Sequence, residues 1–253
     1  LLAALLLSAG LLGGQRAWAR AGGAALILGA ALVTWHPFPP RLPSHELEIT
    51  ALDVAQGDAL VVLAPPGRVM LVDCGGLSRT EPAPDTGEQI VSPYLWSRGI
   101  RRLDVVALTH AHYDHVAGLE SVLANFPVRE LWLPPSQESE PYARLVELAG
   151  QHRVPVRMRH SGESAVLGDV RITFLSPGAD YRPGRRAHNN DSLVMRLLYS
   201  RRVALLTGDV ERKMEVRMIE AGGTLRSDWL KVPHHGSKTS LSLIHISEPT
   251  RPY

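Results

Sequence analysis

The stretch 109-THAHYDHVAGL-119 places three histidines and one aspartate within six residues. It follows 103-LDVVALT-109, an apolar run typical of a buried strand. The polar side chains therefore fall on the loop that leaves this strand, where residues i and i+2 of extended backbone point the same way. Imidazole and carboxylate groups suit zinc, manganese or iron. The stretch predicts a metal site with the candidate ligands His110, His112, Asp114 and His115.

Polar residues of the same types recur after two later apolar runs. Asp209 follows 203-VALLTG-208, and His234 and His235 lie within 230-LKVPHHGSKTS-240. Each feature alone is typical of a turn, but their recurrence at strand ends indicates one shared site. The scattered His152 and His160 have no such neighbours, and we interpret both as solvated or structural side chains.

Composition restricts how such a site could be built. The chain has 253 residues, a formal net charge of +2 and ordinary globular composition. Its mild basic excess permits an anionic partner without requiring one. The single cysteine, Cys74, excludes an internal disulfide framework and a cysteine-based zinc finger. Any metal must therefore be held by histidines and carboxylates.

Apolar or alternating runs predict strands, and runs with helical spacing predict helices. Strands are expected at 46–54, 58–64, 68–76, 103–109, 129–134, 154–158, 170–175, 193–199, 202–207 and 229–232. Helices are expected at 86–98, 116–126, 141–152 and 211–221. The first three strands should form an antiparallel meander. The later alternation favours an α/β sandwich, in which helices cover two sheets.

The N-terminal region differs from the rest. Residues 1–14 and 21–35 carry no charge and flank a segment with Arg16 and Arg20. A signal peptide is one interpretation, but two apolar runs favour the end of a membrane region at 1–38, with a linker at 39–45. Arginines between the runs indicate a cytoplasmic turn. We therefore expect location at the cytoplasmic (inner) membrane, with the following domain on its outer side.

Several motifs resemble known families. HxHxDH at 110–115, Gly208-Asp209 and a later histidine resemble the metallo-β-lactamase fold. More narrowly, the chain resembles the C-terminal domain of the ComEC/Rec2 family of DNA-internalisation proteins over about 46–240. The motifs that carry this second resemblance are LDVAQGDALVV, LVDCGG, NNDSLVMRL, LLTGDVE and LKVPHHGS. The resemblance implies an αββα sandwich with hydrolase chemistry, preceded by transmembrane helix segments.

The chain departs from that family in three places. Ala55 stands where the family usually has glycine, and His112 stands where many members have aspartate. Residues 241–253 (LSLIHISEPTRPY) replace the family's further helix, strand and loop and resemble a translated sequencing adapter. We therefore expect a hydrolase domain at 46–240 that is incomplete at its C-terminus, followed by a non-native tail.

The resemblance implies two divalent ions, zinc or manganese. His110, His112 and His188 would hold one ion, Asp114, His115 and His234 the other, and Asp209 would bridge them. Asp114, Asp209 and His235 are the candidate catalytic residues. Asp58 and Asp73 are candidates to orient the metal-binding imidazoles, and Ser237 and Lys238 to contact a substrate phosphate. Arg182, Arg185 and Arg186 could line a strand-binding groove, although three arginines taken alone favour a solvated loop.

Two questions stay open at this point. His188 is either a ligand or a solvated histidine, with Asn189 or Asn190 then facing the ion or the phosphate. The implied function is a nuclease that degrades the non-transported DNA strand during uptake, with DNA, the membrane and the uptake machinery as partners. The alternatives are a non-catalytic domain that guides DNA and a hydrolase of another phosphodiester, such as a choline-bearing cell-wall polymer.

Overall fold

The computed structural model describes residues 8, 16–35, 42–76, 84–135 and 138–240. The chain divides into two compact units, Leu1–Pro40 and Arg41–Tyr253. In the first unit, helix α2 spans Arg16–Trp35. Among the described helices, none is long and apolar enough to cross a membrane. The membrane segment expected at 21–35 is therefore helical but not confirmed as a span, and 1–14 lies, apart from residue 8, outside the described residues.

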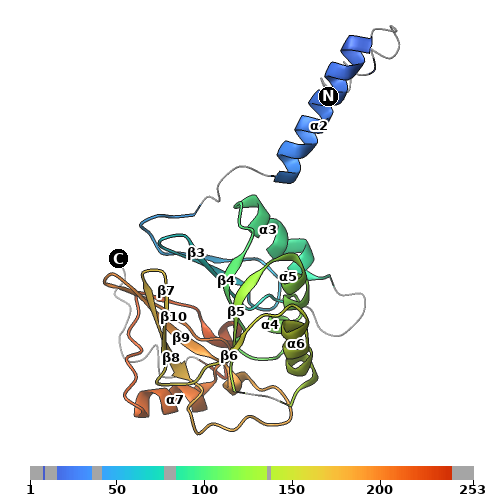
Figure 1. Ribbon diagram of the computed structural model, residues 1–253. Coiled ribbons are helices and arrows are strands. Elements are labelled where there is room, and N and C mark those ends of the chain that lie inside the picture. The colour runs from blue at the N-terminus through green and yellow to red at the C-terminus, as the bar shows by residue number, and fades with distance from the viewer. Residues whose placement is uncertain (1–7, 9–15, 36–41, 77–83, 136–137, 241–253) are drawn as a thin grey trace. The chain divides into compact units, whose positions relative to one another are not determined.

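The second unit contains two sheets (Figure 1). The first has the order β1 (Glu48–Ala51), β2 (Leu60–Ala64), β3 (Arg68–Val72), β4 (Leu103–Ala107), β5 (Val128–Leu133) and β6 (Val156–Met158). Strands β1 to β3 form the expected antiparallel meander, and β3 to β6 run parallel. Parallel strands end at the same edge, so the segments after β3 and β4 emerge side by side.

The second sheet has the order β11 (Trp229–Leu230), β10 (Arg202–Leu206), β9 (Val194–Tyr199), β8 (Val170–Ser176) and β7 (Ser164–Leu167). Its pairs are antiparallel except β10 with β11. Strand β7 was not predicted, because its apolar run is only three residues long and its side chains are mostly solvent-facing. It forms by pairing with the buried strand β8.

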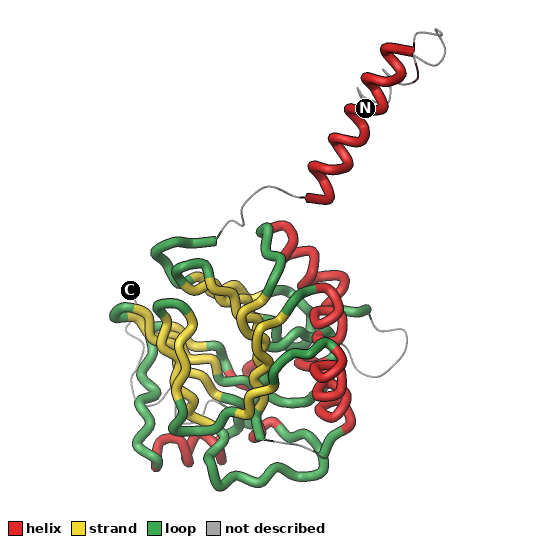
Figure 2. The backbone as a smooth tube through the Cα atoms, viewed as in Figure 1, coloured by secondary structure: helices red, strands yellow, loops and turns green. Residues whose placement is uncertain are grey.

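Several helices lie along the outer face of the first sheet, and one helix lies at one end of the second, as Figure 2 shows. Helices α3 (Ser92–Ser97), α5 (Leu119–Asn125) and α6 (Glu140–Gln151) pack against the first sheet, and α7 (Arg212–Glu220) packs against the second. Successive side chains of a strand point to opposite faces. In β2, Val61 and Leu63 therefore join the core beneath the helices, whereas Leu60 and Val62 join the core between the sheets. The expected αββα sandwich is confirmed.

Two helices differ from their predicted bounds. The helix expected at 86–98 is a π-helical turn, Gly87–Val91, followed by α3, which begins near Pro93. The helix expected at 116–126 is split into α4 (Tyr113–Val116) and α5. Asp114 and His115 therefore lie on a short helix and not on the predicted loop. Gly118 separates the two pieces, where a Cβ atom would lie 2.5 Å from the Cys74 oxygen and 2.6 Å from the Gly87 nitrogen.

Gly118→Ala should destabilise the domain by about 1–3 kcal/mol, because the added methyl group meets backbone atoms that cannot move independently. Gly150→Ala is the matched control, since a Cβ on this helical glycine meets nothing within 4 Å. Alanine is the better helix former, so this variant should gain about 0.5–1 kcal/mol. Urea unfolding of the metal-free chain measures both values. Equal stability of the two variants would contradict the tight contact at Gly118.

Candidate metal centre

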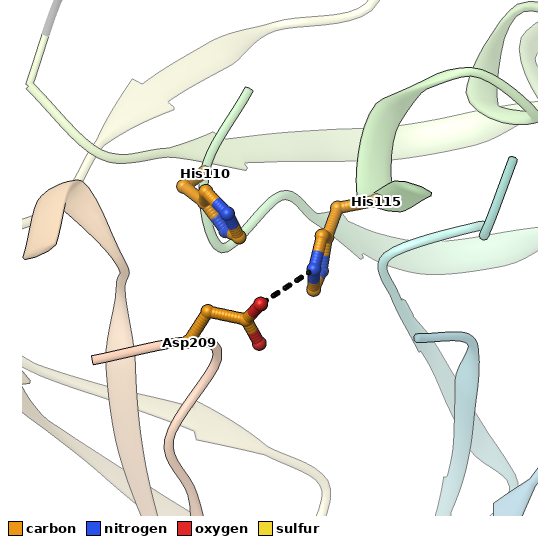
Figure 3. Close-up of side chains that lie close together, drawn as sticks. All are labelled: His110, His115 and Asp209. Carbon is orange, nitrogen blue, oxygen red and sulfur yellow. Dashed lines mark hydrogen bonds and ion pairs between the residues drawn. The ribbon is translucent and has the colours of Figure 1, made fainter. Parts of the chain in front are cut away.

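Three segments bring imidazoles and carboxylates together at one edge of the sandwich. His110 and His112 follow β4, Asp114 and His115 lie on α4, and Asp209 follows β10. Figure 3 shows His110, His115 and Asp209 converging, with an ion pair between the last two. All three are buried. Side chains almost a hundred residues apart in the sequence thus form one polar cluster in the interior.

The described residues contain four groups in which three ligand atoms lie within 4.8 Å of one another. The groups are His110–His115–Asp209, Asp114–His115–His235, Asp58–Asp73–His115 and Asp58–Asp209–His235. His115 belongs to three of them, so this ring lies at the centre of the cluster. His112, His188 and His234 belong to none of the four.

Asp73 orients the His115 ring by contacting the ring nitrogen that faces away from Asp209. Its Oδ2 lies 2.8 Å from His115 Nδ1, and the opposite ring nitrogen, Nε2, faces Asp209 Oδ2 at 3.2 Å. The Thr109 backbone N–H and hydroxyl also donate to Asp73, each at 2.7 Å. A carboxylate in this position fixes the ring and directs its other nitrogen toward a metal. Burial raises the pKa of Asp73, and the nearby His115 charge opposes this.

Hydrogen bonds to neighbouring groups occupy one ring nitrogen of His110 and one of His112, and the two remaining nitrogens face each other. The Thr109 hydroxyl donates to Asp73, so at 3.2 Å it accepts from His110 Nδ1. The Ala187 carbonyl can only accept, so His112 Nε2 donates to it at 2.9 Å. Both remaining nitrogens, His110 Nε2 and His112 Nδ1, then present lone pairs 2.9 Å apart. Two facing lone pairs repel unless a cation or proton lies between them, which suits a shared metal ion.

His235, and not His234, points into the cluster. His235 Nε2 lies 3.2 Å from Asp209 Oδ2 and 3.6 Å from Asp114 Oδ2. His234 instead contacts Thr239 at 2.9 Å and the Asn189 amide at 3.2 Å. Both histidines have left-handed backbone, with φ of 48° and 49°. This conformation is uncommon for residues with a side chain and is often found at functional sites.

Lys231 is a member of the cluster that the sequence analysis did not identify. Its ammonium group makes an ion pair with Asp58 and lies 3.2 Å from Asp209 Oδ1 and 2.9 Å from the Gly208 carbonyl. Only 10% of its side chain is exposed. The signal was its place in LKVPHHGS, directly after strand β11. Lys231 occupies one oxygen of Asp209 and leaves the other facing His115 and His235.

The charges of the cluster fit divalent cations. Asp58, Asp73, Asp114 and Asp209 face one lysine, which leaves an excess of negative charge. Burial disfavours a charge on His115, but Asp73 and Asp209 outweigh it and raise the His115 pKa to about 10. Asp114 and Asp209 raise the pKa of His235 to about 9. Protons on these rings thus supply the positive charge that metal ions could supply instead.

Two further side chains respond to the same surroundings. Burial lowers the pKa of His110 well below its usual value, so this ring is neutral and keeps a lone pair. Burial alone would raise the pKa of Asp209, but hydrogen bonds from His115 and His235 lower it well below its usual range. A neutral imidazole beside an ionised carboxylate is a donor set suited to zinc or manganese. The residues present therefore fit the expected ions.

The remaining candidates lie outside the cluster. His188 is exposed and donates its backbone N–H to Asp191. Ser237 contacts Thr239, and Lys238 is exposed. The arginine loop is solvated, with Arg185 93% exposed and 3.5 Å from Glu138. These placements leave the proposed roles of His188, Ser237 and Lys238 as predictions.

Ala55, which replaces the usual glycine, has φ of 63°. This left-handed conformation favours glycine, which explains physically why glycine is usual at this position in the family.

Known proteins are similar to this chain in sequence and in fold. The model of the metallo-beta-lactamase superfamily matches residues 52–244. ComE operon protein 3 of Bacillus subtilis (strain 168) is 34% identical over 208 residues, 78% of this chain and 26% of the relative. Competence protein ComA of Neisseria gonorrhoeae is 31% identical over 254 residues, 98% of this chain and 31% of the relative. This chain therefore spans about a quarter to a third of these relatives.

A solved structure supports the same fold. The MIM-2 metallo-beta-lactamase superposes with a TM-score of 0.51 and 17% sequence identity, covering 81% of this chain and 83% of the other. At this identity the likeness concerns the fold alone. Family model, curated relatives and superposition agree. The chain belongs to the metallo-β-lactamase superfamily, a metal-dependent hydrolase fold, and its curated relatives include competence proteins of the ComEC/Rec2 family.

Proposed function

We propose that this chain is the hydrolase part of a DNA-uptake protein and cleaves phosphodiester bonds of DNA, degrading the strand that is not transported. The observation that carries the proposal is the buried group His110–His115–Asp209, joined at its edge by Asp114 and His235. The kinship with competence proteins supports DNA as the substrate. The facing nitrogens of His110 and His112 support a second ion beside the first.

Two bound ions would supply a nucleophilic hydroxide and neutralise the negative charge that develops during phosphodiester cleavage. His110 and His112 would hold one ion, and Asp114, His115 and His235 the other, with Asp209 between them. His235 thus takes the ligand role that the sequence analysis gave to His234, because its ring lies nearer Asp114 and Asp209. Asp114 is only partly buried, so its carboxylate can also orient a water molecule from solvent.

His110→Ala and Asp209→Ala should each reduce DNA cleavage by the manganese-loaded chain at least a hundredfold, because each removes a buried ligand. Each should also lower the number of bound metal ions, measured by atomic emission. His152→Ala is the matched control, since this exposed histidine lies at the end of α6, outside the cluster. It should retain wild-type cleavage and metal content.

The outcomes separate the proposal from its alternatives. Cleavage that survives in both ligand variants would contradict the assignment of the site. Bound metal with no cleavage of single- or double-stranded DNA would favour a domain that guides DNA. Cleavage of a choline-bearing phosphodiester in preference to DNA would favour another substrate class.

Metal binding should release protons, because His115 and His235 are protonated at neutral pH in the metal-free chain. The protonated rings of His115 and His235 stabilise the metal-free fold. This contribution is fully present below about pH 6.5 and disappears as the pH rises through 9 to 10. Zinc affinity should rise between pH 6.5 and 8 by roughly tenfold per pH unit for each displaced proton.

Calorimetry in buffers of different ionisation enthalpy measures the proton release. His235→Ala should release about one proton fewer, whereas the control His152→Ala should match the wild type. A zinc affinity independent of pH over this range would contradict the protonated state of the two rings.

His188→Ala tests the open ligand assignment. If His188 binds the first ion, its removal should lower metal affinity on the order of 10- to 100-fold, and excess manganese should partly restore cleavage. Unchanged metal stoichiometry and cleavage would assign His188 to solvent. Asn189 or Asn190 would then be the residue that faces the ion or the substrate.

The location of the domain outside the cytoplasmic membrane also remains a proposal, and it rests on the sequence. Arg16 and Arg20 precede the apolar part of α2, and basic residues favour the cytoplasmic side. Single cysteines introduced at exposed positions in a Cys74→Ser background should react with a membrane-impermeant reagent added outside the cells. Labelling only after the cells are opened would contradict this orientation.

A further inference from the structure

A pocket of about 310 Å³ adjoins the metal centre at His112. The loop before β9 and the start of α7 form its other walls. Its lining includes Tyr181, His188, Asn189, Glu211, Lys213 and Arg217. Pockets that bind small molecules occupy roughly 300–1,000 Å³, so this pocket accommodates about one nucleotide unit. Because it opens beside a candidate metal ligand, its occupant could be continuous with a group at the metal centre.

Hydrogen bonds hold the loop wall of the pocket in place. The buried Asp191 accepts from the Tyr181 hydroxyl at 2.6 Å and from the His188 backbone N–H at 2.7 Å. The Asn189 amide donates to Glu211 at 3.1 Å, and the Asn190 carbonyl accepts from the Glu211 backbone N–H at 2.9 Å. These bonds join the loop to the start of α7. The pocket is therefore formed before any ligand enters.

The helix wall carries two positive charges, and the lining contains one acidic side chain. Lys213 and Arg217 lie four residues apart, hence on one face of α7. Within the described residues, neither forms an ion pair with a carboxylate. Glu211, the one acidic side chain in the lining, already accepts hydrogen bonds from Asn189 and Asn190. The pocket thus has an excess of positive charge and polar hydrogen-bonding groups, which suits a phosphate ester.

We propose that this pocket binds the nucleotide next to the scissile phosphodiester, and that Lys213 and Arg217 hold its phosphate. This inference rests on the proposed function, since it takes DNA as the substrate. Neither residue lies in the ligand cluster, so both contribute to substrate binding and not to metal binding. The pocket would thereby fix which phosphodiester of a strand reaches the ions.

The double variant Lys213→Gln/Arg217→Gln tests the proposal. Binding of a fluorescent oligothymidylate to the full chain is measured in the presence of a metal chelator. Neither bound metal nor cleavage then contributes to the measured affinity. We expect the dissociation constant to rise on the order of tenfold, as for lost charge-assisted hydrogen bonds. The slope of log affinity against log salt should fall by about 0.7 for each lost phosphate contact. With manganese, KM should rise while kcat and metal content stay near wild type.

The matched control is Arg171→Gln/Arg201→Gln, which removes the same charge from exposed positions at the opposite end of the second sheet. An equal loss of affinity in both double variants would overturn the proposed role of the pocket, because the loss would then reflect net charge alone. Unchanged binding in the pocket variant would overturn it as well. So would displacement of the oligonucleotide by equimolar inorganic phosphate, since the pocket would then bind a free anion.

Failure of this inference is distinguishable from failure of the proposed function. If the wild-type chain cleaves DNA and the pocket variant binds normally, only the pocket is wrong. If the wild-type chain binds the oligonucleotide but never cleaves DNA, the proposed function fails, and the comparison of binding still decides the pocket.

Discussion

The geometry of the site depends on one buried carboxylate, that of Asp73. It accepts hydrogen bonds from the backbone and hydroxyl of Thr109 and contacts His115, so it joins the ends of β3 and β4 to helix α4. Burying a carboxylate costs several kcal/mol unless donors surround it. Here the donors also position the two segments that carry His110 and His115. The left-handed backbone of Asp73, with φ of 57°, turns its side chain toward them.

Much of the fold could be predicted because several of its strands are buried on both faces. In β2 and β4 every residue is buried, and such runs are recognisable without any partner. Strand β7 was missed because it depends on β8 for its pairing and is itself mostly solvent-facing. The break between α4 and α5 was missed because it depends on close backbone contacts of Gly118 with Cys74 and Gly87. Such contacts join distant segments and leave no periodic pattern.

In the candidate site too, some residues could be predicted from the sequence and others could not. HxHxDH lies within one short segment, so its residues could be identified from spacing. The choice between His234 and His235 could not be made from spacing, because two successive left-handed residues send the neighbouring rings to different surroundings. Lys231 was overlooked because lysine is not a metal ligand at neutral pH. Its role becomes visible only when Asp58 and Asp209, 151 positions apart in number, meet at its ammonium group.

Ligand cluster and pocket are built on different supports. The cluster lies at the ends of buried strands, where the core fixes the backbone, and a shared fold at 17% identity is compatible with such a framework. The pocket lies on the loop before β9 and on α7, where surface residues can change without disturbing either sheet. Asn189 and Asn190 connect the two, because they tie the loop beside His112 to Glu211 at the start of α7. The same loop also holds His112 through the Ala187 carbonyl and Asp209 through the Ser192 hydroxyl, so only a change on α7 would alter the pocket and leave the ligands in place.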